Sequence, residues 1–192
     1  MDTKICLGFP TTGTIKTITF HSVVAMLKHS KFPYEIVTKE GSILHWNREH
    51  IAKMAIERNC SHLLFIDSDM QFEPDAAERL LARDKDIIGV QYNLRKFPKT
   101  STVKVWDENG KELMEDQGNG LLKVASVATG FMLIKTSVFE KLSHPWFFWE
   151  SDENGEVKTG EDSWFCRKAR EAGYEIFCDI TIPIKHWGEY AY

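Results

Sequence analysis

The residues best suited to chemistry in this chain are two aspartates that follow a short apolar run. Residues 62–66 are almost entirely hydrophobic and are followed directly by Asp67-Ser68-Asp69. Two carboxylates this close repel each other unless a cation or solvent lies between them, and such oxygen ligands suit Mg²⁺ or Mn²⁺. A metal bound there could bridge to a diphosphate and neutralise charge that develops on a leaving group. The pattern predicts a divalent-metal site; the alternative is an aspartate-rich turn that caps the helix expected from Pro74.

Two other kinds of site with closely spaced aspartates are excluded by single residues. An EF-hand calcium loop needs glycine at its sixth position, where this chain has Phe72. A phosphatase of the haloacid dehalogenase type resembles D-x-D-x-T/V, whereas the fifth position here is Gln71. Neither kind of site therefore explains Asp67 and Asp69.

A second pair of acids, Glu161 and Asp162, stands at the start of a predicted helix. Acidic residues favour the first turn of a helix because its N-terminal end carries positive partial charge, and Thr159 with Asp162 resembles a capping box. A structural role is therefore one interpretation of this pair. The other is a general base that deprotonates an acceptor hydroxyl, for which a carboxylate that stays ionised at neutral pH is suited.

His186 is the third candidate, and it follows the last predicted strand. A neutral imidazole is a common metal ligand, and the neighbouring Gly188 leaves space beside it. A lone histidine is more often a structural residue, so the sequence leaves both roles open. The other six histidines show no ligand spacing; they are residues 21, 29, 45, 50, 62 and 144.

The elements that must position these residues alternate along the first half of the chain. Apolar runs and helical periodicity predict strands at 5–9, 32–38, 62–66 and 86–92, and helices at 15–29, 43–58 and 74–83. This order predicts an α/β sheet with helices on both faces. Ligands of such sheets bind outside the carboxyl ends of the strands, which is where Asp67 and Asp69 stand.

The pattern changes after about residue 94. Residues 95–120 are polar and rich in turn formers, with a hairpin turn expected at 107–110. Strands are expected at 121–127, 131–134, 176–178 and 182–184, and helices at 136–142 and 161–172, the last ending at Gly173 in a left-handed cap. The acidic segment 150–160 is expected to be a loop.

The composition indicates one globular domain. The chain has 192 residues, 43% of them hydrophobic, and a net charge of −4 that disfavours a general nucleic-acid binder. No C-x-x-C pair is present, so we expect buried, reduced cysteines. The N-terminal apolar run is too short for a signal peptide and no stretch approaches a membrane span. We expect a soluble cytoplasmic protein, in the host cytosol if the gene is viral.

Four motifs occur in a fixed order: the D-x-D after an apolar strand, T-G-F-M-L-I-K at 129–135, G-E-D-x-x-F at 160–165 followed by A-G-Y, and H-W-G at 186–188. Together they resemble GT-A-fold glycosyltransferases, and more narrowly the family 2-type and phage or viral glycosyltransferase-like proteins, over about residues 5–188. The resemblance implies a single GT-A (nucleotide-diphospho-sugar transferase) domain over 1–192, with a mostly parallel central sheet flanked by helices and a small antiparallel β element. Residues 1–94 would form the nucleotide-binding half and 95–192 the acceptor-binding half.

The activity that the resemblance implies is metal-dependent transfer of a sugar, of the hexosyltransferase type. The donor would be a UDP- or GDP-sugar, and the acceptor a hydroxyl of a glycan, a lipid-linked sugar, a protein or a modified nucleobase. Asp67, Asp69 and His186 would hold Mn²⁺ or Mg²⁺, some contacts through water. Asp162 would be the base, which gives inversion at the sugar carbon.

The resemblance also implies roles for residues around these. Pro10 and Thr11 match the segment that meets the nucleoside, and Ser68 lies within the metal-binding motif. Arg48 matches a helix-borne basic residue near the nucleotide, and Gly130 a close-packed position near the donor sugar. Thr38 occupies the place of an acidic residue that often contacts uracil, for which Glu40 is the nearest acidic candidate. Acceptor contacts are expected from Glu161 and from Trp187; Trp164 is a further candidate for stacking on a sugar.

Two other functions remain open. A nucleotidyltransferase shares the general fold and uses a metal, but it usually carries a glycine-rich, basic loop after the first strand. Here that loop is Pro10-Thr11-Thr12-Gly13, with Lys16 nearby. A non-catalytic module that binds nucleotide sugars or carbohydrate is the third possibility. The sequence does not indicate the oligomeric state.

Overall fold

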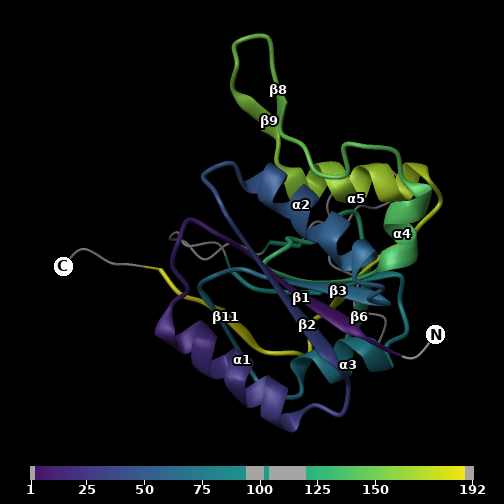
Figure 1. Ribbon diagram of the computed structural model, residues 1–192. Coiled ribbons are helices and arrows are strands. Elements are labelled where there is room, and N and C mark those ends of the chain that lie inside the picture. Colours follow the sequence, from purple (N-terminus) through teal and green to yellow (C-terminus); the bar gives the residue numbers. More distant parts are fainter. Residues whose placement is uncertain (1–2, 94–101, 104–119, 189–192) are drawn as a thin grey trace.

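The computed structural model describes residues 3–93, 102–103 and 120–188, and its main feature is a seven-stranded sheet covered by helices on both faces (Figure 1). The hairpin turn predicted at 107–110 lies outside the described residues. The first nine elements are β1 (Ile5–Thr11), α1 (Thr17–His29), β2 (Tyr34–Glu40), α2 (Leu44–Glu57), β3 (His62–Ile66), β4 (Met70–Phe72), α3 (Ala76–Ala82), β5 (Ile87–Val90) and β6 (Leu121–Val124). The remaining elements are β7 (Phe131–Lys135), α4 (Thr136–Lys141), β8 (Glu150–Ser151), β9 (Val157–Thr159), α5 (Glu161–Glu171), β10 (Ile176–Asp179) and β11 (Ile184–His186).

The strand order of the large sheet is β2-β1-β3-β7-β5-β10-β6. β1 is parallel to β2 and β3, and β5 is parallel to β10, whereas β7 is antiparallel to both of its neighbours and β6 runs antiparallel to β10. β2, β1, β3, β5 and β10 therefore share one direction, which confirms the mostly parallel sheet. β4 and β11 form a small antiparallel sheet of their own.

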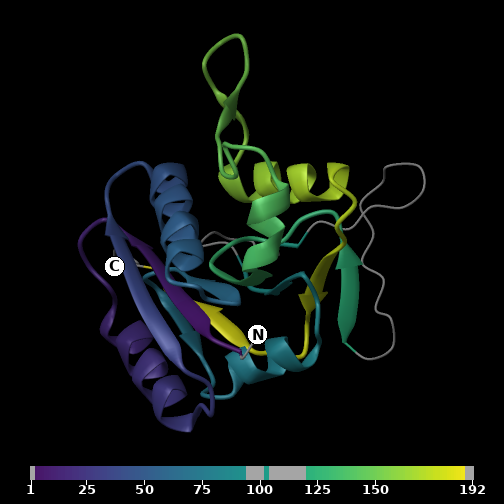
Figure 2. The same ribbon diagram turned by 45° about the vertical axis from the view of Figure 1, so that its right-hand side comes forward.

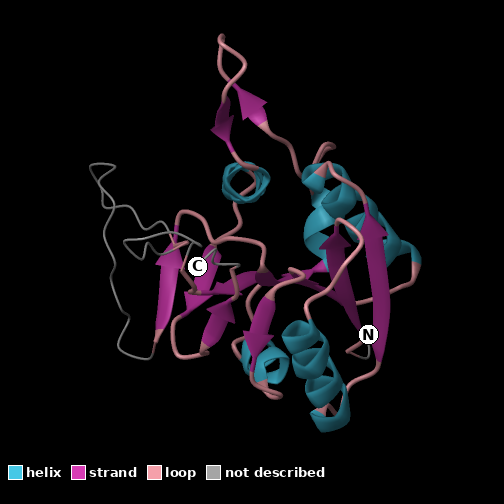
Figure 3. Ribbon diagram, turned by 90° about the vertical axis from the view of Figure 1, so that its left-hand side faces the viewer, coloured by secondary structure: helices cyan, strands magenta, loops and turns pink. Residues whose placement is uncertain are grey.

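β3 shows how the sequence builds two cores. Its side chains alternate between the faces of the sheet, so Leu63 and Phe65 pack in one hydrophobic cluster while Leu64 and Ile66 pack in the other. The first cluster includes residues of α2, α4 and α5, and the second includes residues of α1 and α3. Figures 1 and 3 show these two helical layers on opposite sides of the strands. A strand buried on both faces is continuously apolar, as the run before Asp67 is.

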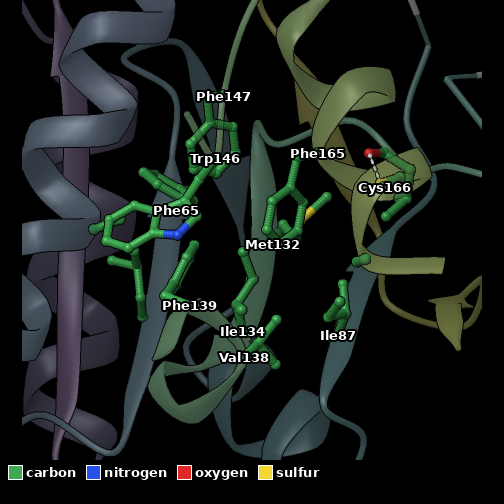
Figure 4. Packing of buried hydrophobic residues seen from close by; sticks show 14 of the residues in the cluster. Phe65, Ile87, Met132, Ile134, Val138, Phe139, Trp146, Phe147, Phe165 and Cys166 are labelled. Carbon is green, nitrogen blue, oxygen red and sulfur yellow. Dashed lines mark hydrogen bonds between the residues drawn. The ribbon is translucent and has the colours of Figure 1, made fainter. Parts of the chain in front are cut away.

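The core beneath α4 and α5 is rich in aromatic rings (Figure 4). Phe147 stacks on Phe165 with ring centroids 4.9 Å apart, and it meets Phe65 of β3 edge-on at 5.4 Å. Phe139 lies 5.7 Å from Phe165. These contacts fix α5, and with it the acidic pair at its first turn, against the central strand of the sheet.

Two helices end at residues with a left-handed backbone, which confirms the cap expected at Gly173. Asn59 follows α2 with a φ of +53° and Gly173 follows α5 with a φ of +89°, the left-handed conformation that ends helices. β2, however, extends from 34 to 40 rather than from 32 to 38. Residue 40 therefore ends the strand, and this shift changes which residues meet the ligand edge.

The prediction of a loop at 150–160 was wrong. β8 and β9 form a two-stranded hairpin that projects beyond α5 (Figures 1 and 2). Asp152 Oδ1 accepts hydrogen bonds from the backbone N–H groups of Asn154 and Glu156, and Gly155 has a φ of +83°. The acidic composition was interpreted as a solvated loop, but aspartate, asparagine and glycine also form turns, and here they form an Asx-type turn.

All four cysteines are buried and free, which confirms that expectation; they are Cys6, Cys60, Cys166 and Cys178. Within the described ranges, none of the helices has the length and apolar character that crossing a bilayer would require.

Candidate functional site

A cavity of about 350 Å³ lies where β1 and β3 end. This is the carboxyl edge of the parallel strands, where α/β sheets bind their ligands, and the volume is within the range of small-molecule sites. The predicted residues Pro10, Thr11, Asp67, Ser68, Asp69 and His186 all line it. The other lining residues come from the loops after β1 and β2 and from the start of α2: Thr12, Gly41, Ser42, Leu44 and Asn47.

The small sheet of β4 and β11 brings His186 to the aspartates. β4 begins directly after Asp69, and β11 pairs with it so that His186 lies opposite Met70. The backbone N–H of Trp187 donates to the carbonyl of Asp69 at 3.0 Å. As a result, Nε2 of His186 lies 3.4 Å from Oδ1 of Asp69, and both side chains are largely buried.

A backbone carbonyl sets the orientation of the His186 ring. Nδ1 lies 3.1 Å from the carbonyl oxygen of Asn93, and because a carbonyl can only accept, Nδ1 carries the hydrogen of this bond. The ring also meets Tyr92 edge-on, with centroids 5.3 Å apart. Nε2 therefore faces a carboxylate, which needs either a proton or a cation at that position. Metal-binding histidines typically donate their other N–H to a carbonyl in this manner.

Asp67 is held differently from Asp69. Its Oδ1 accepts a hydrogen bond from Nη2 of Arg48 at 2.9 Å. Across the described part of the chain, no three or more His, Cys, Asp or Glu side chains are grouped so that they could hold a metal. Asp69 and His186 are adjacent, whereas Arg48 competes for the first oxygen of Asp67, so the three-ligand site stays a prediction.

Arg48 lies beneath the cavity instead of lining it. Its side chain is 2% exposed, and its Nε donates to Oε1 of Glu161 at 3.2 Å. Nε1 of Trp149 donates to the other oxygen, Oε2, at 2.6 Å. Burial alone would lower the pKa of Arg48, but the carboxylates of Asp67 and Glu161 outweigh it and raise that pKa. A guanidinium bridges two acids at separate nitrogens, which suits arginine and not lysine.

These contacts change the interpretation of two predicted site residues. Arg48 was expected near the nucleotide; the structure places it against Asp67 and outside the cavity lining, and a nucleotide contact for it stays a prediction. Glu161 was expected at the acceptor, but it is buried, and both of its oxygens accept hydrogen bonds from within the protein. An acceptor contact for Glu161 stays a prediction that its present partners do not favour.

Gly130 is close-packed as expected, but the protein itself fills the space beside it. A Cβ at this position would overlap the hydroxyl of Tyr92 and the methyl group of Met70. The backbone N–H of Gly130 donates to the Tyr92 hydroxyl at 3.0 Å. Burial, and then the charge of Asp67, raises the pKa of Tyr92 well above its usual value, so this hydroxyl stays protonated. The predicted approach of a donor sugar to Gly130 is untested.

Tyr92 is a site residue that sequence reasoning missed. Its ring contacts the ring of His186, its hydroxyl accepts a hydrogen bond from the backbone N–H of Gly130, and the charge of Asp67 raises its pKa. The available signal was its place just after the apolar strand β5, because parallel strands end at the same edge of the sheet. β7 is inserted between β3 and β5, and this insertion was not apparent from the chain order.

The loop after β2 contributes residues that were also missed. Thr38 is exposed, lies within β2 and does not line the cavity, because the strand extends two residues further than predicted. Gly41 and Ser42 line it instead, and Nδ2 of Asn47 donates to the carbonyl of Gly41 at 2.8 Å. Glu40 ends β2 opposite Thr11. A strand end misplaced by two residues was enough to shift the predicted contact.

Asp162 and Trp187 lie outside the cavity lining. Asp162 is half-buried, its Oδ1 accepts from the backbone N–H of Ser163 at 2.6 Å, and its charge also reaches the hydroxyl of Tyr92. The exposed indole of Trp187 donates to Oε1 of Gln71 at 2.9 Å. Their roles as base and as acceptor contact stay predictions.

Known structures share this arrangement of elements. A viral protein, A197 from STIV, aligns over 97% of this chain and 86% of its own, with a TM-score of 0.67 and 17% identity. The S. aureus TarS 1-349 structure in complex with UDP-GlcNAc aligns over the whole of this chain at a TM-score of 0.56 and 14% identity. The fold is that of the GT-A glycosyltransferases.

The similarity to TarS covers only part of the TarS chain and is low in sequence. This chain spans 60% of the TarS chain bound to UDP-GlcNAc, and a second TarS 1-349 structure aligns at a TM-score of 0.50 and 13% identity. Neither protein-family models nor curated proteins gave a match to the sequence. The shared GT-A architecture supports a general glycosyltransferase-like fold, and the chemistry has to be argued from the side chains.

Proposed function

We propose that this protein is a metal-dependent glycosyltransferase that moves a sugar from a UDP- or GDP-linked donor to a hydroxyl acceptor. The observation that carries the proposal is the approach of His186 Nε2 to Asp69 Oδ1, 3.4 Å apart in the cavity at the carboxyl edge. These residues stand 117 positions apart in the chain (186 − 69), and the GT-A topology brings them together.

The charges around the cavity support a cation between protein and diphosphate. Asp67 and Asp69 line it, and no Lys or Arg belongs to the lining among the described residues. A diphosphate would therefore meet two carboxylates with no cationic side chain on the cavity wall to bind it, since Arg48 lies outside the lining and pairs with Asp67. Asp69 and His186 Nε2 are suited to hold Mn²⁺ or Mg²⁺. Asp67 would join through Oδ2, which has no hydrogen-bond partner in the described part of the chain.

The metal, when bound, would neutralise charge on the departing nucleoside diphosphate. The side chains of the protein do the rest. Arg48 fixes Asp67 in position through its hydrogen bond to Oδ1, and the Asn93 carbonyl keeps the imidazole of His186 turned toward Asp69. Fixed charges of this kind stabilise a transition state without reorganisation.

The nucleoside would lie against the end of β1 and the loop after β2. Pro10, Thr11, Gly41 and Ser42 line that part of the cavity, and Thr11 Oγ1 donates to the carbonyl of Thr14, which shapes the loop after β1. TarS, which shares the fold, was crystallised with UDP-GlcNAc, and this supports a uridine donor over a guanosine donor. Asp162, at the start of α5, would accept the proton of the acceptor hydroxyl.

Calorimetric titration of UDP- and GDP-sugars, with and without Mn²⁺, tests the donor site. We expect binding that depends on the metal and that falls by at least about tenfold in Asp69→Asn, because a direct ligand matters at least as much as an outer-shell partner. Asp86→Asn is the matched control, since Asp86 is half-exposed and pairs with Lys135 outside the site. Tight binding of either nucleotide sugar without metal would refute the proposed site.

Asp162→Asn tests the base separately. Donor binding should persist, while release of UDP or GDP from the donor in the presence of acceptor should be lost. Slow hydrolysis of the donor by the unaltered protein would argue against a non-catalytic binding module. Full transfer by Asp162→Asn would assign the base to another residue or the reaction to a retaining mechanism.

A further inference from the structure

A second cavity, of about 390 Å³, lies on the other side of the first turns of α2. Successive helix residues point about 100° apart, so Leu44 and Asn47 line the first cavity while His45, Trp46 and Glu49 line the second. Its remaining wall comes from the segment after α4, including His144, Phe147 and Phe148. We call this cavity the aromatic pocket.

The rings of the aromatic pocket form a concave apolar surface. His45 makes ring contacts with Trp46, Phe148 and Trp149, at interplanar angles of 75°, 65° and 57°. Trp46 is 63% exposed and Phe148 is 41% exposed. None of these three ring pairs is parallel, so His45 and its neighbours do not form a slot of the kind that sandwiches a flat nucleobase.

The polar side chains of His45 and Glu49 stand among the rings of the pocket, and Glu49 is the one of the two that can meet hydroxyl groups. Nδ1 of His45 is buried and has no hydrogen-bond partner in the described part of the chain, an arrangement that costs free energy unless a ligand or water completes it. Glu49 accepts from the backbone N–H of Phe147 and lies 3.1 Å from Nδ1 of His144. A carboxylate has about four lone-pair sites, so Glu49 can accept further hydrogen bonds from hydroxyl groups. Its negative charge disfavours ligands that carry phosphate.

We propose that the aromatic pocket binds a carbohydrate, with the apolar face of a sugar ring against Trp46 and its hydroxyls at Glu49. An apolar peptide side chain would offer no hydrogen-bond donor to Glu49. A sugar ring combines an apolar C–H face with a rim of hydroxyls, and this combination matches the pocket.

The pocket connects to the first turn of α5. Trp149 contacts His45, and its indole donates to Glu161, the residue before Asp162. The bound carbohydrate would be part of the acceptor, held beside the element that carries the proposed base. This acceptor role rests on the proposed function, whereas carbohydrate binding itself does not.

Saturation-transfer NMR with the methyl glycosides of glucose, galactose, mannose and N-acetylglucosamine tests the pocket. We expect transfer to the C–H groups of at least one glycoside, and affinity about fivefold weaker in Trp46→Ala, as the loss of one aromatic contact implies. Phe20→Ala is the matched control, because Phe20 is 58% exposed on α1, in the helical layer on the other face of the sheet. Since both side chains are mostly exposed, neither variant should unfold.

Binding of UDP-sugar with Mn²⁺ is measured in the same samples. Loss of glycoside binding in Trp46→Ala, with donor binding kept, supports the pocket as a carbohydrate site separate from the donor site. If the protein binds a glycoside but no nucleotide-sugar donor, the carbohydrate site is supported and the proposed glycosyltransferase function is refuted. The proposal is overturned if no glycoside binds, if Trp46→Ala binds as well as Phe20→Ala, or if uridine or a tryptophan peptide binds at this pocket in their place.

Discussion

Replacing Arg48 with methionine tests the buried charges that hold Asp67 below the cavity. The guanidinium makes two charge-assisted hydrogen bonds, 2.9 Å to Asp67 and 3.2 Å to Glu161. Methionine fills most of the same volume but supplies neither bond. The substitution therefore separates the role of the charge from the role of packing against Phe65, whose ring centroid lies 5.3 Å from the guanidinium carbon.

The two carboxylates do not contribute equally to the expected loss. The side chain of Asp67 is 28% exposed, so water can solvate it once Arg48 is removed, whereas that of Glu161 is only 11% exposed. Breaking a buried pair by removing one partner costs about 3–5 kcal/mol, because the remaining charge is uncompensated. We expect Arg48→Met to lower the free energy of unfolding by that amount, with most of the loss arising at Glu161.

Urea unfolding of a double-mutant cycle measures this coupling. Adding Glu161→Gln to Arg48→Met removes the uncompensated charge and should recover about 1–3 kcal/mol, the cost of an unsatisfied buried group. Arg58→Met is the control, because its ion pair with Glu35 is exposed on both sides and should be worth less than about 1 kcal/mol. Equal losses in Arg48→Met and Arg58→Met, or a cycle without coupling, would refute the buried network.

Two further substitutions probe the supports of the fold. Burial favours the neutral form of Asp179, but hydrogen bonds from Arg83 and Thr181 outweigh burial and lower the pKa of Asp179. The ionised Asp179 therefore stabilises the folded protein above the unfolded pKa of about 3.9. This contribution to the free energy of unfolding is lost as the pH falls through the folded pKa. Asp179→Asn should therefore cost about 1.5–3 kcal/mol in urea unfolding at pH 7, and its deficit should shrink below about pH 4; a constant deficit would contradict this assignment. Gly130→Ala should cost about 1–3 kcal/mol through overlap with Tyr92, and Tyr92→Phe in the same chain should recover part of it; a neutral Gly130→Ala would show that the contact can relax.

The sheet and the position of the aspartates were predictable for a physical reason. A strand buried on both faces must be continuously apolar, so residues 62–66 identified the central strand, and the carboxyl edge of that strand identified the cavity. Helix ends were marked by Asn59 and Gly173, whose backbone conformations few other residues adopt easily. These are local signals, and each depends on only a few neighbouring residues.

The remaining features depend on contacts between distant parts of the chain. β4 has only three residues, Met-Gln-Phe, and one alternation this short does not distinguish a strand from a turn, although β4 places His186 beside Asp69. The family resemblance placed Arg48 near the nucleotide, and nothing in its local sequence shows that Glu161, 113 positions later, pairs with it. Tertiary partners of this kind decide whether a charged side chain serves the ligand or the protein.

The two aspartates of the site are held by opposite parts of the molecule. Asp67 is bound by Arg48 of α2, whereas Asp69 is bound through its carbonyl by Trp187 and lies beside His186 at the end of β11. The carboxylate of Asp67 thus has a cationic partner in Arg48, whereas that of Asp69 faces Nε2 of His186, where a proton or a cation is needed. Arg48 uses only one oxygen of Asp67, so a cation could join Asp69, His186 and the second oxygen of Asp67 while the network under the cavity stays intact. The same network ends at Trp149, which contacts the wall of the aromatic pocket, and a substitution there is therefore expected to affect both cavities.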